Sequence, residues 1–230
     1  MKKILLLLAC FGSMTLYGQN GFSLEPQVGV GISNVKTSGP ADPHSVSVFD
    51  GLLGVGYRYN HFVVSSGIGY LRTGYKVNIT FTDALGNPIS TVGAYTYFNH
   101  LVVPVSVGRE LELSKQLSLV PTVGASVSYN MSARETTFDM NGRAYMKHVP
   151  SEEFDNSYKP LSVFAKLQIG VDYKLSTRMS MTLAPVVNYM LSNIAVQHSG
   201  APVKEVQNNY AFLLNAGVKW YLGTLHPAAK

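Results

Sequence analysis

The feature that most constrains the fold is a strict alternation of apolar and other side chains in residues 161–191. Every second residue from 161 to 173 is apolar, and after a polar break at Ser176-Thr177 the alternation resumes from 179 to 191. A period of two over runs this long indicates β-strands, because successive side chains of a strand point to opposite faces. Two such runs joined by a tight polar turn predict an antiparallel hairpin.

The two faces of this hairpin differ as they do in a membrane barrel. One face is continuously apolar, whereas the other carries Lys166 and Asp172. A strand with lipid on one side and a polar lumen on the other has this pattern. Charged residues make up only 13% of the chain, about half the share that is usual in a soluble domain. No window contains the roughly 18 or more apolar residues of a spanning helix. A closed barrel is the other structure that satisfies its backbone in lipid.

Six further segments show the same alternation. They are residues 22–33, 48–59, 62–82, 91–107, 117–129 and 209–222. Together with the hairpin they predict an all-β fold, a closed antiparallel up-and-down transmembrane β-barrel of eight strands, with ten strands as the alternative. The connections alternate between long and short, as extracellular loops and periplasmic turns do. An even strand count places both termini in the periplasm. Strands longer than a membrane requires are expected to project as extracellular hairpins.

Several local signals predict turns and irregularities. Asn60-His61, residues 83–88 with Gly86-Asn87, and the Asn141-Gly142 pair predict hairpin turns. The alternation changes phase near Thr73-Gly74, where the glycine suggests a β-bulge. Proline removes a donor from the hydrogen-bond ladder, so further bulges are expected at Pro26, Pro104, Pro121 and Pro185.

The N-terminus resembles a processing segment. Lys2-Lys3 precede a largely apolar run that ends at the small residue Gly18, which predicts a signal peptide over residues 1–18. Lipidation at Cys10 is the alternative. Cys10 is the only cysteine, so a chain cleaved after Gly18 has no disulfide or thiolate chemistry. Cleavage leaves 16 of the 18 basic residues against 13 acidic ones, a net charge of +3, and no nucleic acid partner is expected. Residues 19–223 then form the barrel and 224–230 a tail.

A set of charged residues falls on the face that would line the lumen. It consists of Glu25, Asp50, Arg58, Lys166, Asp172 and Lys219. An eight-stranded barrel is just wide enough for its side chains to fill, and buried charges are costly unless they are paired. We therefore expect these charges to pair across the lumen and close it, with a conduction path as the alternative. Aromatic residues near the strand ends, Tyr57, Tyr59, Tyr95, Tyr97, Tyr129, Tyr173, Tyr189, Tyr210 and Trp220, predict girdles at the two membrane interfaces.

The sequence contains no strong motif for catalysis, and no cofactor or metal is predicted. It lacks a P-loop, a dinucleotide fingerprint, an HExxH motif and a nucleophile elbow. His44, His148 and His198 fall in three outer loops and could form a surface hydrolase site, but their spacing matches no metal template. Three functions remain open: a non-enzymatic barrel that is structural or binds through its loops, a narrow porin, and a barrel hydrolase. A soluble lipocalin-like barrel would need an apolar cavity lining, which the glycine-rich polar face argues against.

Four segments carry a family resemblance. They are Tyr17-Gly18-Gln19-Asn20 at the end of the leader, Leu101-Val102-Val103-Pro104-Val105, residues 187–194, and residues 218–223. They resemble the outer-membrane β-barrel domain family that is widespread in Bacteroidetes, often labelled porin-family or PorT-like. The resemblance implies an outer-membrane location, contact with outer-membrane lipid and the barrel assembly machinery, tolerance of strand prolines, and an extracellular or envelope protein partner that it does not name. The tail 224–230 departs from the pattern, because such barrels usually end on or near an aromatic residue.

Overall fold

The computed structural model describes residues 21–37, 42–138, 144–149, 158–194 and 207–222. Eight long strands form its framework: β1 (Gly21–Thr37), β3 (Val46–Tyr59), β4 (Phe62–Thr82), β5 (Pro88–Arg109), β7 (Leu117–Phe138), β9 (Leu161–Lys174), β10 (Met179–Met190) and β11 (Gln207–Tyr221). Three short strands accompany them: β2 (Pro43–His44), β6 (Leu111–Glu112) and β8 (Ala144–His148). The predicted signal peptide and tail lie outside the described residues. Within the described part, no helix is long and apolar enough to cross a membrane.

The long strands close into a ring. Each pairs antiparallel with its neighbours along the chain, and β1 pairs with β11 from Ser23↔Tyr221 to Thr37↔Gln207. The short strands pair outside this ring, β2 with β4 and both β6 and β8 with β7. The prediction of an antiparallel up-and-down barrel with eight strands is confirmed, and the alternative of ten is not needed.

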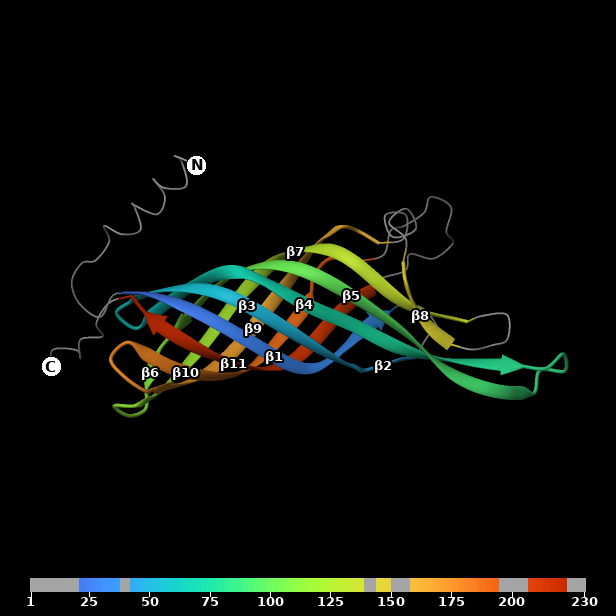
Figure 1. Cartoon of the computed structure of the whole chain (residues 1–230), viewed down its shortest axis with the longest axis horizontal. Helices are drawn as coiled ribbons and strands as arrows, with labels where there is room; N and C mark the ends of the chain where they lie inside the picture. Colours follow the sequence, from blue (N-terminus) through green and yellow to red (C-terminus); the bar gives the residue numbers. More distant parts are fainter. Residues whose placement is uncertain (1–20, 38–41, 139–143, 150–157, 195–206, 223–230) are drawn as a thin grey trace.

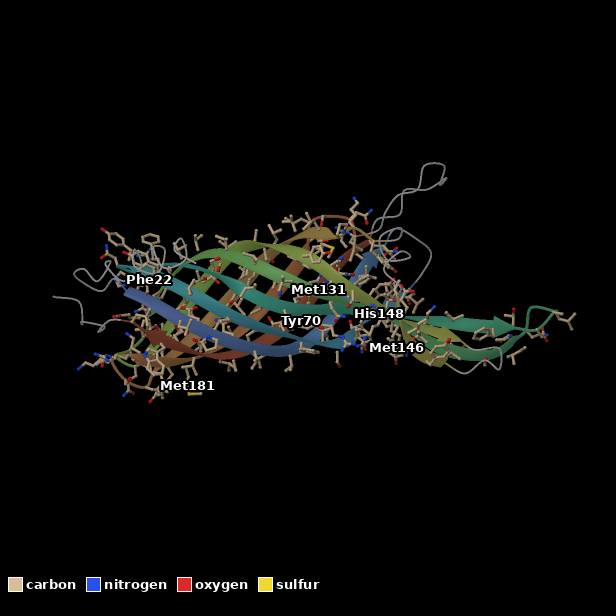
Figure 2. All side chains as sticks on the ribbon, turned by 45° about the horizontal axis from the view of Figure 1, so that its top comes forward. Phe22, Tyr70, Met131, Met146, His148 and Met181 are labelled. Carbon is tan, nitrogen blue, oxygen red and sulfur yellow. The ribbon has the colours of Figure 1, made fainter. Side chains whose placement is uncertain are left out.

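The two ends of the barrel differ (Figure 1). One end, which we call the turn end, carries the short connections, including Asn60-His61 between β3 and β4. The first and last strands also meet there, with Ser23 opposite Tyr221. The other end, the loop end, carries β2, β8 and a long projection of β4 and β5 (Figure 1). Figure 2 shows Phe22 and Met181 near the turn end and His148 near the loop end.

Inside and outside follow the predicted alternation along the barrel. On β1, Val28 and Val30 are 67% and 68% exposed, whereas their neighbours Gln27 and Glu25 are buried. Aromatic side chains form two belts on the outer face. Trp220 and Tyr57 belong to the belt at the turn end, and Tyr210 to the belt nearer the loop end. Ten residues separate Trp220 from Tyr210, which at about 3.3 Å per residue and a tilt of about 40° gives a band of about 25 Å.

The predicted bulge at Thr73-Gly74 is wrong. These residues pair with Phe98 and Tyr97 in a register that runs without a break along β4 and β5, and the shift lies instead between Phe81 and Thr82. The bulky residues of β4 change face near Thr73 because β4 leaves the barrel there. In the barrel they lie on the outer face, which lipid would cover. Beyond the barrel they lie on the opposite face, which continues the inward face of the strand.

The bulges expected at the four prolines are also wrong. Pro26 pairs with Leu53 of β3, while the β1–β11 ladder passes from Leu24 to Gln27 with its register unchanged. Similar one-sided gaps lie beside Pro104 and Pro185. Beside Pro121, the ladder passes from Gly108↔Thr122 to Leu111↔Leu119, while Pro121 stays paired with Ile169 of β9. The reason is that each residue of an antiparallel strand directs its N–H to one neighbour only. A proline therefore weakens one ladder and leaves the other to hold the register.

Other local predictions are confirmed at the turns. β3 ends at Tyr59 and β4 begins at Phe62, so Asn60-His61 is a two-residue connection. Asn60 has φ 55°, and Gly86, in the turn between β4 and β5, has φ 85°. Phe138 of β7 pairs antiparallel with Ala144 of β8, whereas the predicted turn at Asn141-Gly142 lies outside the described residues. β1 and β7 run beyond their predicted ends because polar residues continue the pairing at the loop end.

Gly31 lies where the backbones of β1 and β11 come close together, and this contact can be tested by substitution. A methyl group at this position would collide with the backbone carbonyl of Phe212, whereas a methyl group on Gly51 would meet no atom within 4 Å. We expect Gly31→Ala to lower the free energy of unfolding by about 1–3 kcal/mol through overpacking. Urea unfolding in lipid vesicles measures this, with Gly51→Ala as the matched control. Equal effects of the two changes would contradict the close contact between β1 and β11.

Candidate functional site: the lumen and the projecting arm

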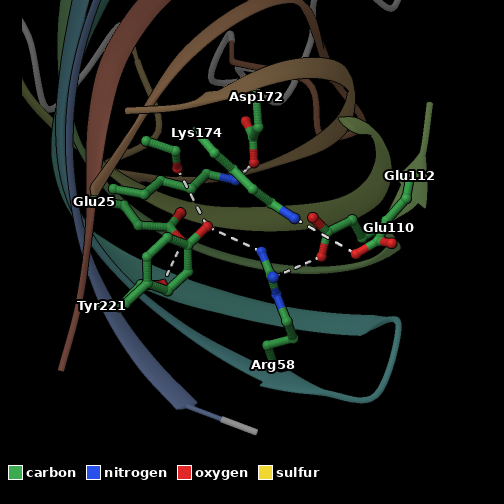
Figure 3. Close-up of polar contacts among 10 residues, drawn as sticks. Glu25, Arg58, Glu110, Glu112, Asp172, Lys174 and Tyr221 are labelled. Carbon is green, nitrogen blue, oxygen red and sulfur yellow. Dashed lines mark hydrogen bonds and ion pairs between the residues drawn. The ribbon is translucent and has the colours of Figure 1, made fainter. Parts of the chain in front are cut away.

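An ion pair occupies the lumen at the turn end (Figure 3). Arg58, at the end of β3, lies 2.7 Å from Glu110, and both side chains are buried. Arg58 Nη2 also donates a hydrogen bond of 2.9 Å to the hydroxyl of Tyr221 on β11. The Ser180 hydroxyl lies 3.3 Å from the same oxygen. Four strands or strand ends are thus tied together across the lumen.

A second ion pair lies beside the first. Lys219 Nζ of β11 donates to Asp172 of β9 at 2.7 Å, and both residues are buried. Thr182 of β10 donates to the other carboxylate oxygen at 2.7 Å. On β1, Glu25 accepts a hydrogen bond of 2.7 Å from Ser23. These contacts supply the partners that buried charges require.

Asp50 and Lys166 lie further from the turn end. Asn215 donates to Asp50 at 3.0 Å. Lys166 lines a cavity together with Glu25 and Lys219, and its volume of about 20 Å³ leaves room for about one water molecule. Among the described residues, Lys166 and Asp50 belong to no ion pair.

The structure therefore places all six charged residues of the predicted set on the lumen side, but it joins only two of them directly, Lys219 and Asp172. Arg58 pairs instead with Glu110, which is not in the predicted set. Glu110 follows β5 directly, and its N–H donates to the carbonyl of His61 at 2.7 Å. The inward positions of β5 are even-numbered, from Phe98 onwards, so residue 110 continues the same phase. This alternation could have identified Glu110 as a lumen residue.

The lumen at the loop end is filled by apolar side chains. We call this cluster the apolar plug; its fully buried large members are Phe98, Phe164, Val186, Met190 and Ile194. The ring of Phe164 meets that of His100 edge to face at 5.4 Å, and Phe98 meets Tyr158 at 4.9 Å. The alternation in the sequence places Phe164, Val186 and Met190 on the inward face but does not show that they gather into one cluster.

One polar group is embedded in this plug. The Nε2 atom of His100 lies 2.9 Å from Thr73 Oγ1, and Asn209 Nδ2 donates to the same oxygen at 3.2 Å. All three residues are fully buried. The lumen thus contains ion pairs towards the turn end and mainly apolar side chains towards the loop end.

The histidines of the candidate hydrolase site lie elsewhere. His44 is on β2 with its Nε2 3.1 Å from Asn78 Nδ2, and His148 is at the end of β8, opposite Arg134. His198 lies outside the described residues. In the described ranges, no group of three or more His, Cys, Asp or Glu side chains could hold a metal ion.

The β4–β5 hairpin continues beyond the barrel as an arm, residues 77–95 (Figure 1). Asp83 is its only charged residue, while Leu85 and Ile89 are 88% and 68% exposed. At its tip the Asp83 carboxylate accepts hydrogen bonds from the side chain of Asn87 at 3.0 Å and from its N–H at 2.8 Å. These bonds, that of the side chain first, hold the pKa of Asp83 below its ordinary value. The arm ends in an ordered turn.

The buried pair at the turn end should matter more to stability than the exposed one. Removing one partner of a buried ion pair costs about 3–5 kcal/mol, whereas an exposed pair contributes about 0–1 kcal/mol. We expect Glu110→Gln to lower the free energy of unfolding by several times more than Glu112→Gln, whose pair with Lys174 is more exposed and 3.5 Å long. Fluorescence of Trp220, the single tryptophan, follows unfolding in urea. Similar losses in both variants would contradict the role given to Glu110.

Comparison with known proteins bears on the family. No curated protein matches the sequence. Among solved structures, Neisserial surface protein A is 16% identical with a TM-score of 0.47, covering 87% of this chain and 96% of its own. Ail of Yersinia pestis, solved with the heparin analogue sucrose octasulfate, is 13% identical with a TM-score of 0.40, covering 87% and 99%. The outer membrane protease OmpT of Escherichia coli is 10% identical with a TM-score of 0.44, covering 92% and 100%.

Likenesses this distant do not bear on function, and the assignment depends on the family model. The model described as an outer membrane protein β-barrel domain matches residues 11–195, which is most of the chain. The closed eight-stranded ring and its exposed apolar outer face agree with that description. The chain belongs to the outer membrane protein β-barrel domain family.

Proposed function

We propose that this outer-membrane barrel is non-enzymatic, that its lumen is closed, and that it has a structural role or binds partners through its loop end. The filled lumen is the observation that supports this proposal most. Ion pairs occupy one half and the apolar plug the other, and the cavity beside Lys166 has a volume of only about 20 Å³. Eight strands leave space for side chains and little else.

The orientation belongs to the same proposal. Transmembrane barrels have short periplasmic turns and longer extracellular loops. We therefore assign the turn end, where β1 begins and β11 ends, to the periplasm and the arm to the cell exterior. A signal peptide over residues 1–18 would deliver the chain to the barrel assembly machinery. Outer-membrane lipid would cover the apolar outer face. The motifs at residues 101–105 and 187–194 support placing the chain among the PorT-like barrels of Bacteroidetes.

Planar-bilayer conductance tests the closed lumen against a narrow porin. We expect the wild-type protein to give no steady single-channel currents, because the plug blocks the loop half of the lumen. The double variant Phe98→Ala with Phe164→Ala shortens two side chains of the apolar plug and is expected to conduct. Its current serves as the control that protein has inserted into the bilayer.

Steady currents from the wild-type barrel that disappear on altering Arg58 or Lys166 would contradict the proposal and support the porin. Hydrolysis of lipid or peptide that is lost in His44→Ala or His148→Ala would support the hydrolase instead.

A further inference from the structure

The outer face of the barrel changes from apolar to cationic near the loop end. On β4 the exposed Ile68 is followed on the same face by Tyr70 and then by Arg72. On β7 the outward Tyr129 is likewise followed by the exposed Arg134. Aromatic side chains on the outer face of a barrel mark the membrane interface. The two arginines, which lie directly beyond them, are therefore at the level of the lipid headgroups.

Arg72 and Arg134 lie on either side of β5. Arg72 pairs with Asn99, and Arg134 pairs with Tyr97, two residues further along the same strand. The strands that carry them are two strand spacings apart, or about 10 Å. Both arginines also interact electrostatically with the hydroxyl of Tyr70. Because arginine side chains are long, the two guanidinium groups can contact one anion bound over β5.

Aromatic rings hold the guanidinium group of Arg72 in place. Its Cζ atom lies 4.0 Å from the centroid of the Tyr97 ring and 5.9 Å from that of Phe49. The Phe49 ring in turn stacks on that of Tyr70 at 5.4 Å. Stacking uses the face of the planar group, so its N–H donors remain at the edge. The Nε–H of Arg72 has no hydrogen-bond partner among the described residues.

Neighbouring side chains do not neutralise these two charges. In the part of the chain that the structure describes, neither arginine belongs to an ion pair. The polar neighbours bond to one another, since the Tyr70 hydroxyl donates to Asn99, whose side-chain amide donates to Ser132 at 2.9 Å. Glu135 lies on the opposite face of β7 and accepts a hydrogen bond from Tyr158. The outer face at this level therefore has an excess of positive charge.

The surroundings favour a lipid over a soluble anion. The apolar outer face reaches the two arginines without interruption, and Leu101 and Met131 are 38% and 45% exposed beside the tyrosines. Tyr70 and Met131 mark this level in Figure 2. A ligand that covers both surfaces needs a negative headgroup and acyl chains.

We propose that Arg72 and Arg134 bind the phosphate group of a lipid in the leaflet at the loop end, with the acyl chains of that lipid along the apolar face below. Arginine suits this role because its fork of N–H donors matches the oxygens of a phosphate. The proposed orientation makes this the outer leaflet, and the inference rests on it for the choice of leaflet only.

Native mass spectrometry of the barrel in detergent tests the ligand. Phosphatidic acid and diacylglycerol with the same acyl chains differ only in the phosphate. We expect phosphatidic acid to remain bound, and neither diacylglycerol nor inorganic phosphate to bind at the same concentration. Equal retention of the two lipids, or inorganic phosphate bound as tightly as phosphatidic acid, would overturn the inference.

Charge removal tests the residues. We expect Arg72→Gln with Arg134→Gln to weaken binding of the first phosphatidic acid by about tenfold or more, because hydrogen bonds between charged groups are lost. Arg109→Gln is the matched control, because Arg109 is exposed on the same outer face and lies over the ring of Phe62 at 6.0 Å, but at the turn end. Heat-modifiable migration in gels checks that both proteins fold. An unchanged affinity in the double variant, or an equal loss in the control, would contradict the assignment.

Labelling in intact cells tests the leaflet separately. In a Cys10→Ser background, Leu85→Cys places a thiol at the tip of the arm, where Leu85 is 88% exposed. We expect a membrane-impermeant maleimide to label it. Failure to label would overturn the proposed orientation and the outer leaflet with it, whereas the phosphate site, which is measured in detergent, stands or falls by the binding results.

Discussion

Closure of the sheet by β1 and β11 is the constraint on which the rest of the structure depends. Lipid supplies no hydrogen-bond partners, so every strand that crosses it needs a neighbour on both sides. The thirteen residue pairs from Ser23↔Tyr221 to Thr37↔Gln207 provide the last ladder. Prolines within the strands are tolerated for the same reason, since each one removes a bond from a single ladder. The arm differs from the barrel in this respect, because β4 leaves the ring there: β3 pairs with it only as far as Leu71 and β2 only as far as Val77.

Closure with eight strands also determines what the interior can contain. The space is narrow enough that Gly31 is needed where β1 approaches β11, and it is filled by inward side chains. Towards the turn end these side chains are charged, and Arg58 with Glu110 and Lys219 with Asp172 neutralise one another. Towards the loop end they are apolar, and Phe98, Phe164 and Met190 are fully buried. A barrel built in this way has its accessible surfaces on the outside and at its ends.

Alternation alone was enough to predict the architecture, because a one-sided apolar face repeated eight times has few solutions. It placed β4 at its observed bounds and the connection at Asn60-His61. Pairing between side chains was harder to predict, since Arg58 and Glu110 meet only through the register of β3, β4 and β5. The apolar plug was missed because its members come from distant strands and share only a height in the barrel. The prediction of bulges at the prolines was wrong because it considered only that proline lacks a backbone N–H. It did not consider that this N–H would have served only one of the two neighbouring ladders.

The closed register of β1 and β11 is tested most directly by a disulfide across it. Val30 and Leu214 lie opposite each other with both side chains on the outer face, so Val30→Cys with Leu214→Cys in a Cys10→Ser background brings the two Cα atoms to about 4.5–5.5 Å. On oxidation of the folded protein in vesicles, we expect an intramolecular disulfide in nearly every chain. Val30→Cys with Trp220→Cys, which lies six residues further along β11, should form none. Failure of the first pair, while Leu183→Cys cross-links with Val171→Cys across the β9–β10 hairpin, would contradict the closed barrel.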